Sequence, residues 1–187
     1  MDTSERELII RAGAGDLRAF ESIYQRTAGF VYSLAFRVTN TKHDAEEVVQ
    51  DVFLKVHKHL RNFKFESSLK TWLYRITVNT ALNTAKKRSR VTSREVEEIF
   101  EDPATVTQAY GAKGLEAEEA EKKLHGFLEQ LNPDQRACIL LREIEAMNYQ
   151  EIAESLGINI NTVRSRLKRA REALMALGKK EVESHGM

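Results

Sequence analysis

The stretch that most constrains this chain runs from Asn148 to Leu174, where two short helical patterns meet at a glycine. Ile152 and Leu156 follow one helical period before Gly157, a residue that readily takes the positive φ at which helices end. Asn159 then offers an N-cap to a second helix. The apolar positions of that second helix recur at helical spacing: Val163, Leu167, Ala170 and Leu174. The stretch therefore predicts a helix-turn-helix.

The face of the second helix opposite this apolar stripe is polar and basic. The residues on this face are Asn161, Arg164, Ser165, Lys168, Arg169 and Arg171, and Thr162 lies next to them in the sequence. Such side chains can donate hydrogen bonds to base edges and phosphates in a major groove. A solvated basic face is the simpler interpretation. However, a glycine corner, a small residue at Ala153 and a basic outward face rarely coincide at this spacing, so we expect DNA binding here.

Charge is segregated along the chain, although the formal net charge is only +1. Residues 1–90 carry 16 Lys and Arg against 10 Asp and Glu, a balance of +6. Residues 91–121 carry 2 against 9, or −7, and residues 122–187 carry 11 against 9, or +2. The hydrophobic period also weakens in the acidic segment, so we expect a flexible acidic linker there, a solvated tether being the simpler interpretation. This charge asymmetry is typical of nucleic-acid binders.

The fold class is predicted to be all-α, with two small helical domains joined by that linker. Only two prolines occur, and almost no alternating β-branched runs call for a sheet. The N-terminus is polar, and no apolar run approaches the roughly 20 residues of a membrane span. The single cysteine, Cys138, lies in an apolar run and is expected to be a buried small hydrophobe. A soluble, cytoplasmic protein is the expectation.

Two helices are predicted in the first half of the chain. Asp16 caps the first, whose expected core positions are Leu17, Phe20, Ile23, Tyr24, Val31, Leu34, Ala35 and Val38. Thr41 and Asp44 predict a capping box for the second. Its expected buried stripe is Ala45, Val48 or Val49, Val52, Phe53 and Val56. Its opposite face carries Glu46, Glu47, Gln50 and Asp51, which either complement the helix dipole or form a protein-docking face.

The segment from Phe63 to Arg90 mixes aromatic and basic side chains. Ser67 and Ser68 form a capping site, after which Leu69, Leu73, Ile76 and Thr80 can pack inward. The residues left for a partner are Lys70, Arg75, Asn79, Lys86, Lys87, Arg88 and Arg90. Aromatic rings beside basic groups suit unstacked single strands, because every base has a π-face and every nucleotide a phosphate. Ordinary core packing of Trp72 and Tyr74 is the alternative.

Four segments together resemble a known family, the extracytoplasmic-function (ECF) group of bacterial RNA polymerase sigma factors. They are Asp44–Val56, Ser68–Asn83, Leu131–Glu145 and Tyr149–Leu174, and the likeness spans about residues 16–177. The resemblance implies a region 2-like domain over residues 1–90, a linker over 91–121 that threads toward the polymerase active site, and a region 4-like domain over 122–187.

The resemblance also implies roles for individual residues. Glu47, Gln50 and Asp51 are expected to dock the clamp of the polymerase β′ subunit. The implied −10 element contacts are Phe65, Glu66, Ser67, Ser68, Lys70, Trp72, Arg75 and Asn79, with a flipped base held by the loop and Asn79. The implied −35 contacts are Asn161, Thr162, Arg164, Ser165, Lys168, Arg169 and Arg171. Expected partners are core polymerase, through the β′ clamp and β flap, promoter DNA and an anti-sigma factor, with no metal or cofactor.

Two other classes of protein remain as alternatives. A helix-turn-helix regulator that recruits no polymerase explains the second half of the chain equally well, but not the aromatic and basic segment around Asn79. An enzyme is the other class. The five histidines share no metal-ligand spacing, and the chain has no Gly-rich phosphate loop or nucleophile motif. The sequence therefore favours a DNA-binding polymerase subunit.

Overall fold

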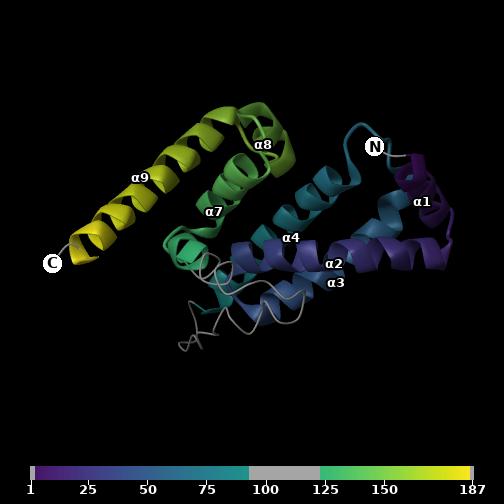
Figure 1. Cartoon of the computed structure of the whole chain (residues 1–187), viewed down its shortest axis with the longest axis horizontal. Helices are drawn as coiled ribbons and strands as arrows, with labels where there is room; N and C mark the ends of the chain where they lie inside the picture. Colours follow the sequence, from purple (N-terminus) through teal and green to yellow (C-terminus); the bar gives the residue numbers. More distant parts are fainter. Residues whose placement is uncertain (1–2, 93–122, 186–187) are drawn as a thin grey trace. The chain divides into compact units, whose positions relative to one another are not determined.

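The computed structural model describes residues 3–92 and 123–185, with side chains over 4–89 and 123–179. The chain divides into two compact units, residues 1–97 and 98–187. Every regular element within the described ranges is helical, and none is a strand (Figure 1). The predicted all-α class with two small helical domains is therefore confirmed.

Unit 1 is a bundle of three long helices crossed by a short one. Its helices are α1 (Thr3–Gly13), α2 (Leu17–Thr39), α3 (Lys42–His59) and α4 (Leu69–Thr92), with a 3-10 turn, η1 (Leu60–Asn62), after α3. The helices α2, α3 and α4 pack against one another, while α1 packs on α2 and η1 (Figure 1). Val31, Val52 and Leu73 have 0% exposure at the centre of this bundle. Burial of such apolar side chains is the main term holding the helices together.

In unit 1, the N-caps of α2 and α4 are those predicted from the sequence, whereas the N-cap of α3 matches its prediction only in part. Asp16 accepts hydrogen bonds from the Arg18 and Ala19 amides, and bonds to these amides and to Arg11 lower the pKa of its carboxyl. Ser68 caps α4 by accepting from the Thr71 amide at 3.0 Å.

Thr41 caps α3 by accepting from the Asp44 amide, which is one half of the predicted capping box. The Asp44 carboxylate is instead buried against Arg88 of α4, with Nη1 and Oδ2 3.1 Å apart. Arg88 was expected to serve an outside partner, but it ties α4 to the start of α3. Lys86 and Lys87 stay exposed, and the Arg90 side chain lies outside the described residues.

Two expected core positions of α2 are wrong. Leu17 is 72% exposed and Tyr24 is 42% exposed. Leu17 lies in the first turn, and the Tyr24 ring only edges onto Phe53, with ring centroids 4.6 Å apart. Helical spacing identified the side of α2 that faces its neighbours, but not how far those neighbours extend along it.

Unit 2 contains the predicted helix-turn-helix. A helix over 123–129 is followed by α7 (Pro133–Ile139), which continues into a π-helical turn over Leu140–Ile144, then by α8 (Tyr149–Leu156) and α9 (Ile160–His185). Capping boxes at Asn132 and Asn148 start α7 and α8. Gly157 has a φ of 63° and ends α8, while Asn159 accepts from the Asn161 amide at 2.8 Å. The glycine corner and the predicted Asn159 cap are confirmed.

A buried arginine holds the start of unit 2 in place. Arg136 donates from Nε to the Leu128 carbonyl at 2.8 Å and from Nη2 to the Leu131 carbonyl at 3.0 Å. Leu128 lies in the last turn of the 123–129 helix, where carbonyls lack intrahelical partners, and its carbonyl also accepts from the Leu131 amide at 3.0 Å just beyond the helix. Burial lowers the pKa of Arg136 to about 10, so it is still charged at neutral pH. The side chain therefore fastens the 123–129 helix to α7.

The neighbouring Cys138 behaves as the sequence predicted. Its side chain is buried, and burial raises the pKa of its thiol to about 11. Such a thiol stays protonated and packs as a small apolar group. The predicted linker over 91–121 begins where α4 still continues through Thr92, and its remaining residues lie outside the described ranges.

Candidate nucleic-acid and partner interfaces

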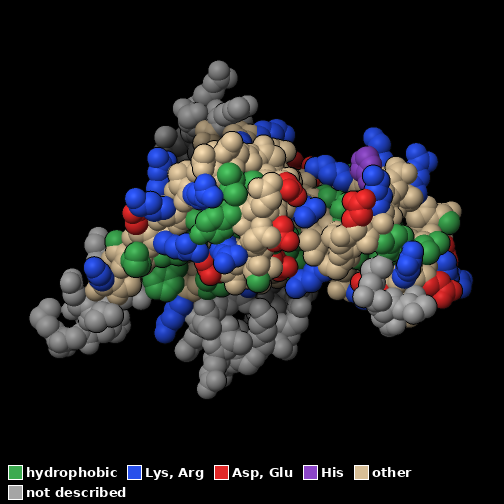
Figure 2. Space-filling model, turned by 90° about the horizontal axis from the view of Figure 1, so that it is seen from above, with side chains coloured by type: hydrophobic (Ala, Val, Ile, Leu, Met, Phe, Trp, Pro, Cys, Tyr) green, Lys and Arg blue, Asp and Glu red, His purple; other side chains and the backbone are tan. Residues whose placement is uncertain are grey.

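The basic face of α9 points away from the core of unit 2. Val163, Leu167 and Ala170 are at most 1% exposed and pack inward. On the opposite face, the exposed side chains are Asn161, Arg164, Ser165, Lys168 and Arg169, while Thr162 is half-buried. Arg164 donates from Nη1 to the Asn161 Oδ1 at 2.8 Å, which orders two donor-bearing side chains side by side. We call these five exposed residues the recognition face. In Figure 2, Lys and Arg side chains are frequent at the left of the molecule, where α9 lies.

The two edges of α9 are fixed to the rest of unit 2 by ion pairs. Arg166 lies 3.4 Å from Asp134 of α7. Arg171 donates from Nη2 to Glu143 at 2.9 Å and contacts the Tyr149 hydroxyl at 3.4 Å, bonds that raise the pKa of its guanidinium. Sequence reasoning grouped Arg171 with the recognition face. The structure places it at the border of that face, tied to the π-helical turn and α8.

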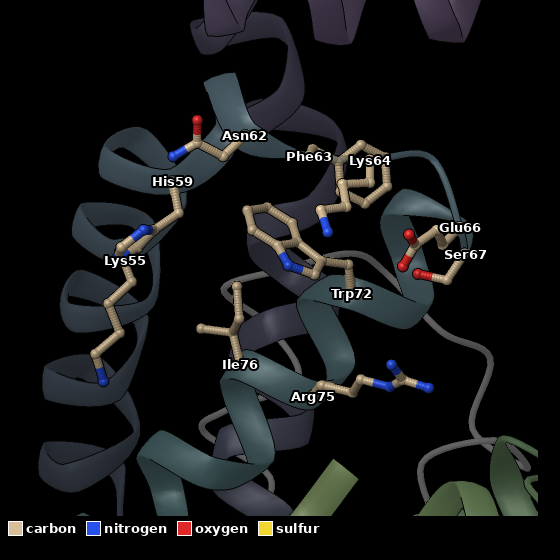
Figure 3. A pocket seen from close by; sticks show the side chains of 10 residues that line it. All are labelled: Lys55, His59, Asn62, Phe63, Lys64, Glu66, Ser67, Trp72, Arg75 and Ile76. Carbon is tan, nitrogen blue, oxygen red and sulfur yellow. The ribbon is translucent and has the colours of Figure 1, made fainter. Parts of the chain in front are cut away.

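A pocket in unit 1 contains much of the predicted −10 contact set. It measures about 710 Å³ and is lined by Lys55, His59, Asn62, Phe63, Lys64, Glu66, Ser67, Trp72, Arg75 and Ile76. In Figure 3, Lys55 and His59 come from α3, Glu66 and Ser67 from the loop before α4, and Trp72 projects between the two sides. Helices and a loop far apart in the sequence thus form one concave, mostly basic surface.

The loop between η1 and α4 is held by a cluster of aromatic rings that meet edge-on or at a tilt. Phe63 meets Phe65 edge-on, with ring centroids 4.9 Å apart, and contacts Trp72 at 5.2 Å. Phe65 has a φ of 60°, a left-handed conformation that costs a residue with a Cβ about 1 kcal/mol or more. Aromatic pairs favour such edge-on geometry, and the contacts help to maintain the strained residue. These contacts therefore give the loop a defined conformation beside the pocket.

The remaining predicted −10 residues lie outside the pocket lining. Ser68 caps α4, and Lys70 places its Nζ 5.4 Å from the Phe30 ring centroid. The Phe65 ring contacts the Phe63 ring edge-on, and Asn79 is half-buried one turn beyond Arg75 on α4. Sequence reasoning missed Lys55, His59, Asn62, Lys64 and Ile76 as lining residues. Lys55 donates to the Thr80 hydroxyl at 2.8 Å, a contact between α3 and α4 that no sequence spacing could indicate.

The exposed face of α3 carries the predicted docking residues around an apolar centre. Glu47, Gln50 and Asp51 are all exposed, whereas the opposite stripe is buried as predicted. Leu54 lies on the same exposed side at helical spacing and is 70% exposed. Sequence reasoning missed it, although a leucine outside the buried stripe was the available signal. Leu54 therefore adds one exposed apolar side chain to the polar docking residues of this face.

Comparison with known proteins decides the family. Residues 23–91 match the model of sigma-70 region 2, and residues 121–174 match that of sigma-70 region 4. The RNA polymerase sigma-H factor of Pseudomonas aeruginosa is 34% identical over 176 residues, covering 91% of each chain. The chain belongs to the sigma-70 family. The ECF RNA polymerase sigma-E factor of Escherichia coli is 35% identical over 177 residues, covering 91% of this chain and 92% of its own.

Solved structures agree with this assignment. A sigma factor RpoE from Bartonella quintana, determined in complex with the anti-sigma factor NepR, is 27% identical, with a TM-score of 0.62. The match covers 86% of this chain and 96% of that one. The chain is thus an ECF sigma factor that directs transcription initiation. The alternative, a helix-turn-helix regulator that is not a polymerase subunit, is not favoured.

No group of three or more His, Cys, Asp or Glu side chains in the described ranges could hold a metal ion. Within the same ranges, no helix is long and apolar enough to cross a membrane.

Proposed function

We propose that this sigma factor joins core RNA polymerase through α3, opens the −10 element at the unit 1 pocket, and reads the −35 element with the recognition face. In this proposal residues 1–90 act as the region 2-like domain, 91–121 as the linker and 122–187 as the region 4-like domain. The main support for the proposal is the pocket, because a regulator that only binds duplex DNA has no need of a concave basic site large enough for a nucleotide.

The chemistry of the pocket suits a nucleotide taken out of the duplex. Its volume of about 710 Å³ is ample for one nucleotide, and Trp72 offers a ring for stacking. Lys55 and Lys64 provide donors, and Glu66 provides an acceptor for an exocyclic amine. The Nε of Arg75 is buried without a hydrogen-bond partner among the described residues. An acceptor on a bound nucleotide would satisfy this donor, which favours binding of the extruded form.

The recognition face suits duplex DNA. Arg164 and Lys168 are one helical turn apart on an exposed face, so both can reach one stretch of major groove. Lys168 lies 3.8 Å from Glu172, an exposed pair that a phosphate can replace at little cost. Ser165 donates to the Thr162 carbonyl, which leaves its oxygen as an acceptor for a base amine.

The α3 face suits a protein partner of opposite charge. Glu47 and Asp51 present carboxylates two turns and one turn before Leu54 on the same exposed side of α3, and Gln50 adds a neutral donor and acceptor. A basic helix with one apolar position would bury Leu54 and pair with the carboxylates around it. We assign the clamp of the polymerase β′ subunit to this face.

The remaining parts of the proposal follow from the family. The sigma factor acts in the cytoplasm with core polymerase, including its β flap, and is itself no enzyme. The Bartonella quintana relative is bound to an anti-sigma factor, and we propose a partner of this kind here.

Permanganate footprinting of open complexes tests the function. Wild-type sigma factor with core polymerase should give reactive thymines on a linear promoter. Asn79→Ala should reduce this signal, change the preferred −10 base, and recover on a template with a pre-melted bubble, because melting is the step it impairs. Wild-type protein that yields no reactive thymines with core polymerase would refute the proposal.

A test of docking uses the α3 face. Glu47→Ala with Gln50→Ala should lower the amount of core polymerase captured in a pull-down while the thermal midpoint stays unchanged. Leu54→Ala should act in the same direction. Unchanged capture, or unfolding of the double variant, would remove the docking assignment.

A further inference from the structure

The short helix α1 lies outside the part of the chain that matches sigma-70 region 2, since that match begins at residue 23. Yet α1 packs directly on the segment that leads into the pocket loop. A Cβ on Gly13 would lie 3.1 Å from the Arg61 Cα and 3.3 Å from the Leu60 carbonyl oxygen. Such distances are tighter than ordinary van der Waals contact, so the backbone of α1 packs closely against η1. The buried Ile9, 1% exposed, anchors the same helix in unit 1.

A second contact joins the other end of α1 to the loop itself. The guanidinium carbon of Arg6 lies 4.9 Å from the centroid of the Phe65 ring. This is the geometry of a cation–π contact, for which Arg is well suited because its planar group can stack on a ring. Phe65 is the residue with φ of 60°, and its ring meets Phe63 at 4.9 Å. Phe63 in turn meets Trp72 in the pocket at 5.2 Å.

We infer that Arg6 is a positioning residue for promoter melting, which fixes the Phe65–Phe63–Trp72 stack so that the pocket is shaped before DNA arrives. The inference rests on the proposed function of the pocket. A left-handed Phe65 persists only where its surroundings hold it, and Arg6 supplies a contact from outside the loop. Pre-shaping a site removes the ordering cost from the binding step, so loss of Arg6 should weaken capture of the extruded base.

The first test needs neither DNA nor polymerase. Trp72 is the only tryptophan in the chain, so its fluorescence reports on the stack alone. Arg6→Ala should increase acrylamide quenching of Trp72 without changing the thermal midpoint by more than the control does. The control is Arg18→Ala, which removes an equal charge from an exposed position on the adjacent α2. Equal quenching in both variants would overturn the inference.

The second test measures promoter opening with full-length protein and core polymerase. A lost exposed cation–π contact corresponds to roughly a two- to fivefold effect, so open-complex formation by Arg6→Ala should fall by that factor. The preference for the −10 base should weaken as well, and Arg6→Lys should restore part of it. Phe65→Leu should have a similar effect, and the double variant should lose less than the product of the two factors.

The alternative role for Arg6 is a direct phosphate contact. In that case Arg6→Ala would lower binding equally for all −10 sequences, reduce the salt dependence by about one counterion, and combine multiplicatively with Phe65→Leu. That outcome would overturn the inference while leaving the pocket's function intact. Failure of wild-type protein to open DNA would instead refute the proposed function.

Discussion

The recognition face and the unit 1 pocket are built in different ways. The recognition face lies on one helix, and its caps, glycine corner and apolar stripe occur within one continuous stretch, Asn148–Leu174. The pocket draws its walls from α3, η1, the loop before α4, and α4, and that loop contains a residue with φ of 60°, Phe65. Local backbone rules specify the first surface, whereas packing between distant segments specifies the second. The two surfaces should therefore respond differently to mutation.

The largest expected effect is a loss of stability in unit 2 that leaves the stability of unit 1 unchanged. Arg136→Ala removes one buried donor from each of the Leu128 and Leu131 carbonyls and opens a cavity, so unit 2 should lose about 3 kcal/mol in its free energy of unfolding. Urea denaturation followed by far-UV circular dichroism measures both units, while Trp72 fluorescence follows unit 1. The fluorescence transition should stay in place. If both transitions shifted together, the two units would have to unfold as one.

The next effect tests the recognition face by DNA affinity. Arg164→Ala and Lys168→Ala should each weaken binding to a preferred upstream duplex by about 1–3 kcal/mol, because each removes a donor from the groove. Core polymerase capture and Trp72 fluorescence should not change. Titration of labelled duplex at fixed salt gives the affinities. An equal loss of polymerase binding in both variants would show that this face has been misassigned.

A smaller effect tests the glycine corner. Gly157→Ala meets no atom within 4 Å, so its cost comes from the φ of 63° and should be about 1 kcal/mol. The matched control is Gly126→Ala, which also meets no atom within 4 Å but lies inside the 123–129 helix. That change should stabilise unit 2, because alanine favours helix more than glycine does. Chemical denaturation of both variants gives the change in the free energy of unfolding for each. Changes of the same sign would contradict the backbone argument.

The smallest effect concerns the border of the recognition face. Arg171→Ala removes an ion pair with Glu143 whose side chains are 44% and 53% exposed, so the free energy of unfolding should fall by less than about 1 kcal/mol. Duplex affinity should stay near that of the wild type, in contrast to Arg164→Ala. A loss of affinity comparable to that of Arg164→Ala would return Arg171 to the DNA-contacting set.

The sequence by itself determined the helices, their caps and the orientation of the recognition face. Asp16, Thr41 and Asn159 each accept a backbone amide as predicted, because capping depends on residues only two or three positions apart. The buried stripes of α3 and α9 followed from helical period alone, although Leu174 at the end of the α9 stripe is only half-buried. Residue type at local spacing was enough for these features.

Only the tertiary structure decided which of these helices share a surface. Arg88 pairs with Asp44 across the bundle, and Lys55 meets Thr80 between α3 and α4. The contact between Arg6 and Phe65 likewise joins segments far apart in the chain. A helical period states which side of a helix faces inward, but it contains no information on which neighbour lies there or how far that neighbour extends. Contacts between distant segments depend on how whole helices pack, and that packing fixed the pocket, its loop and the ion pairs at the edges of α9.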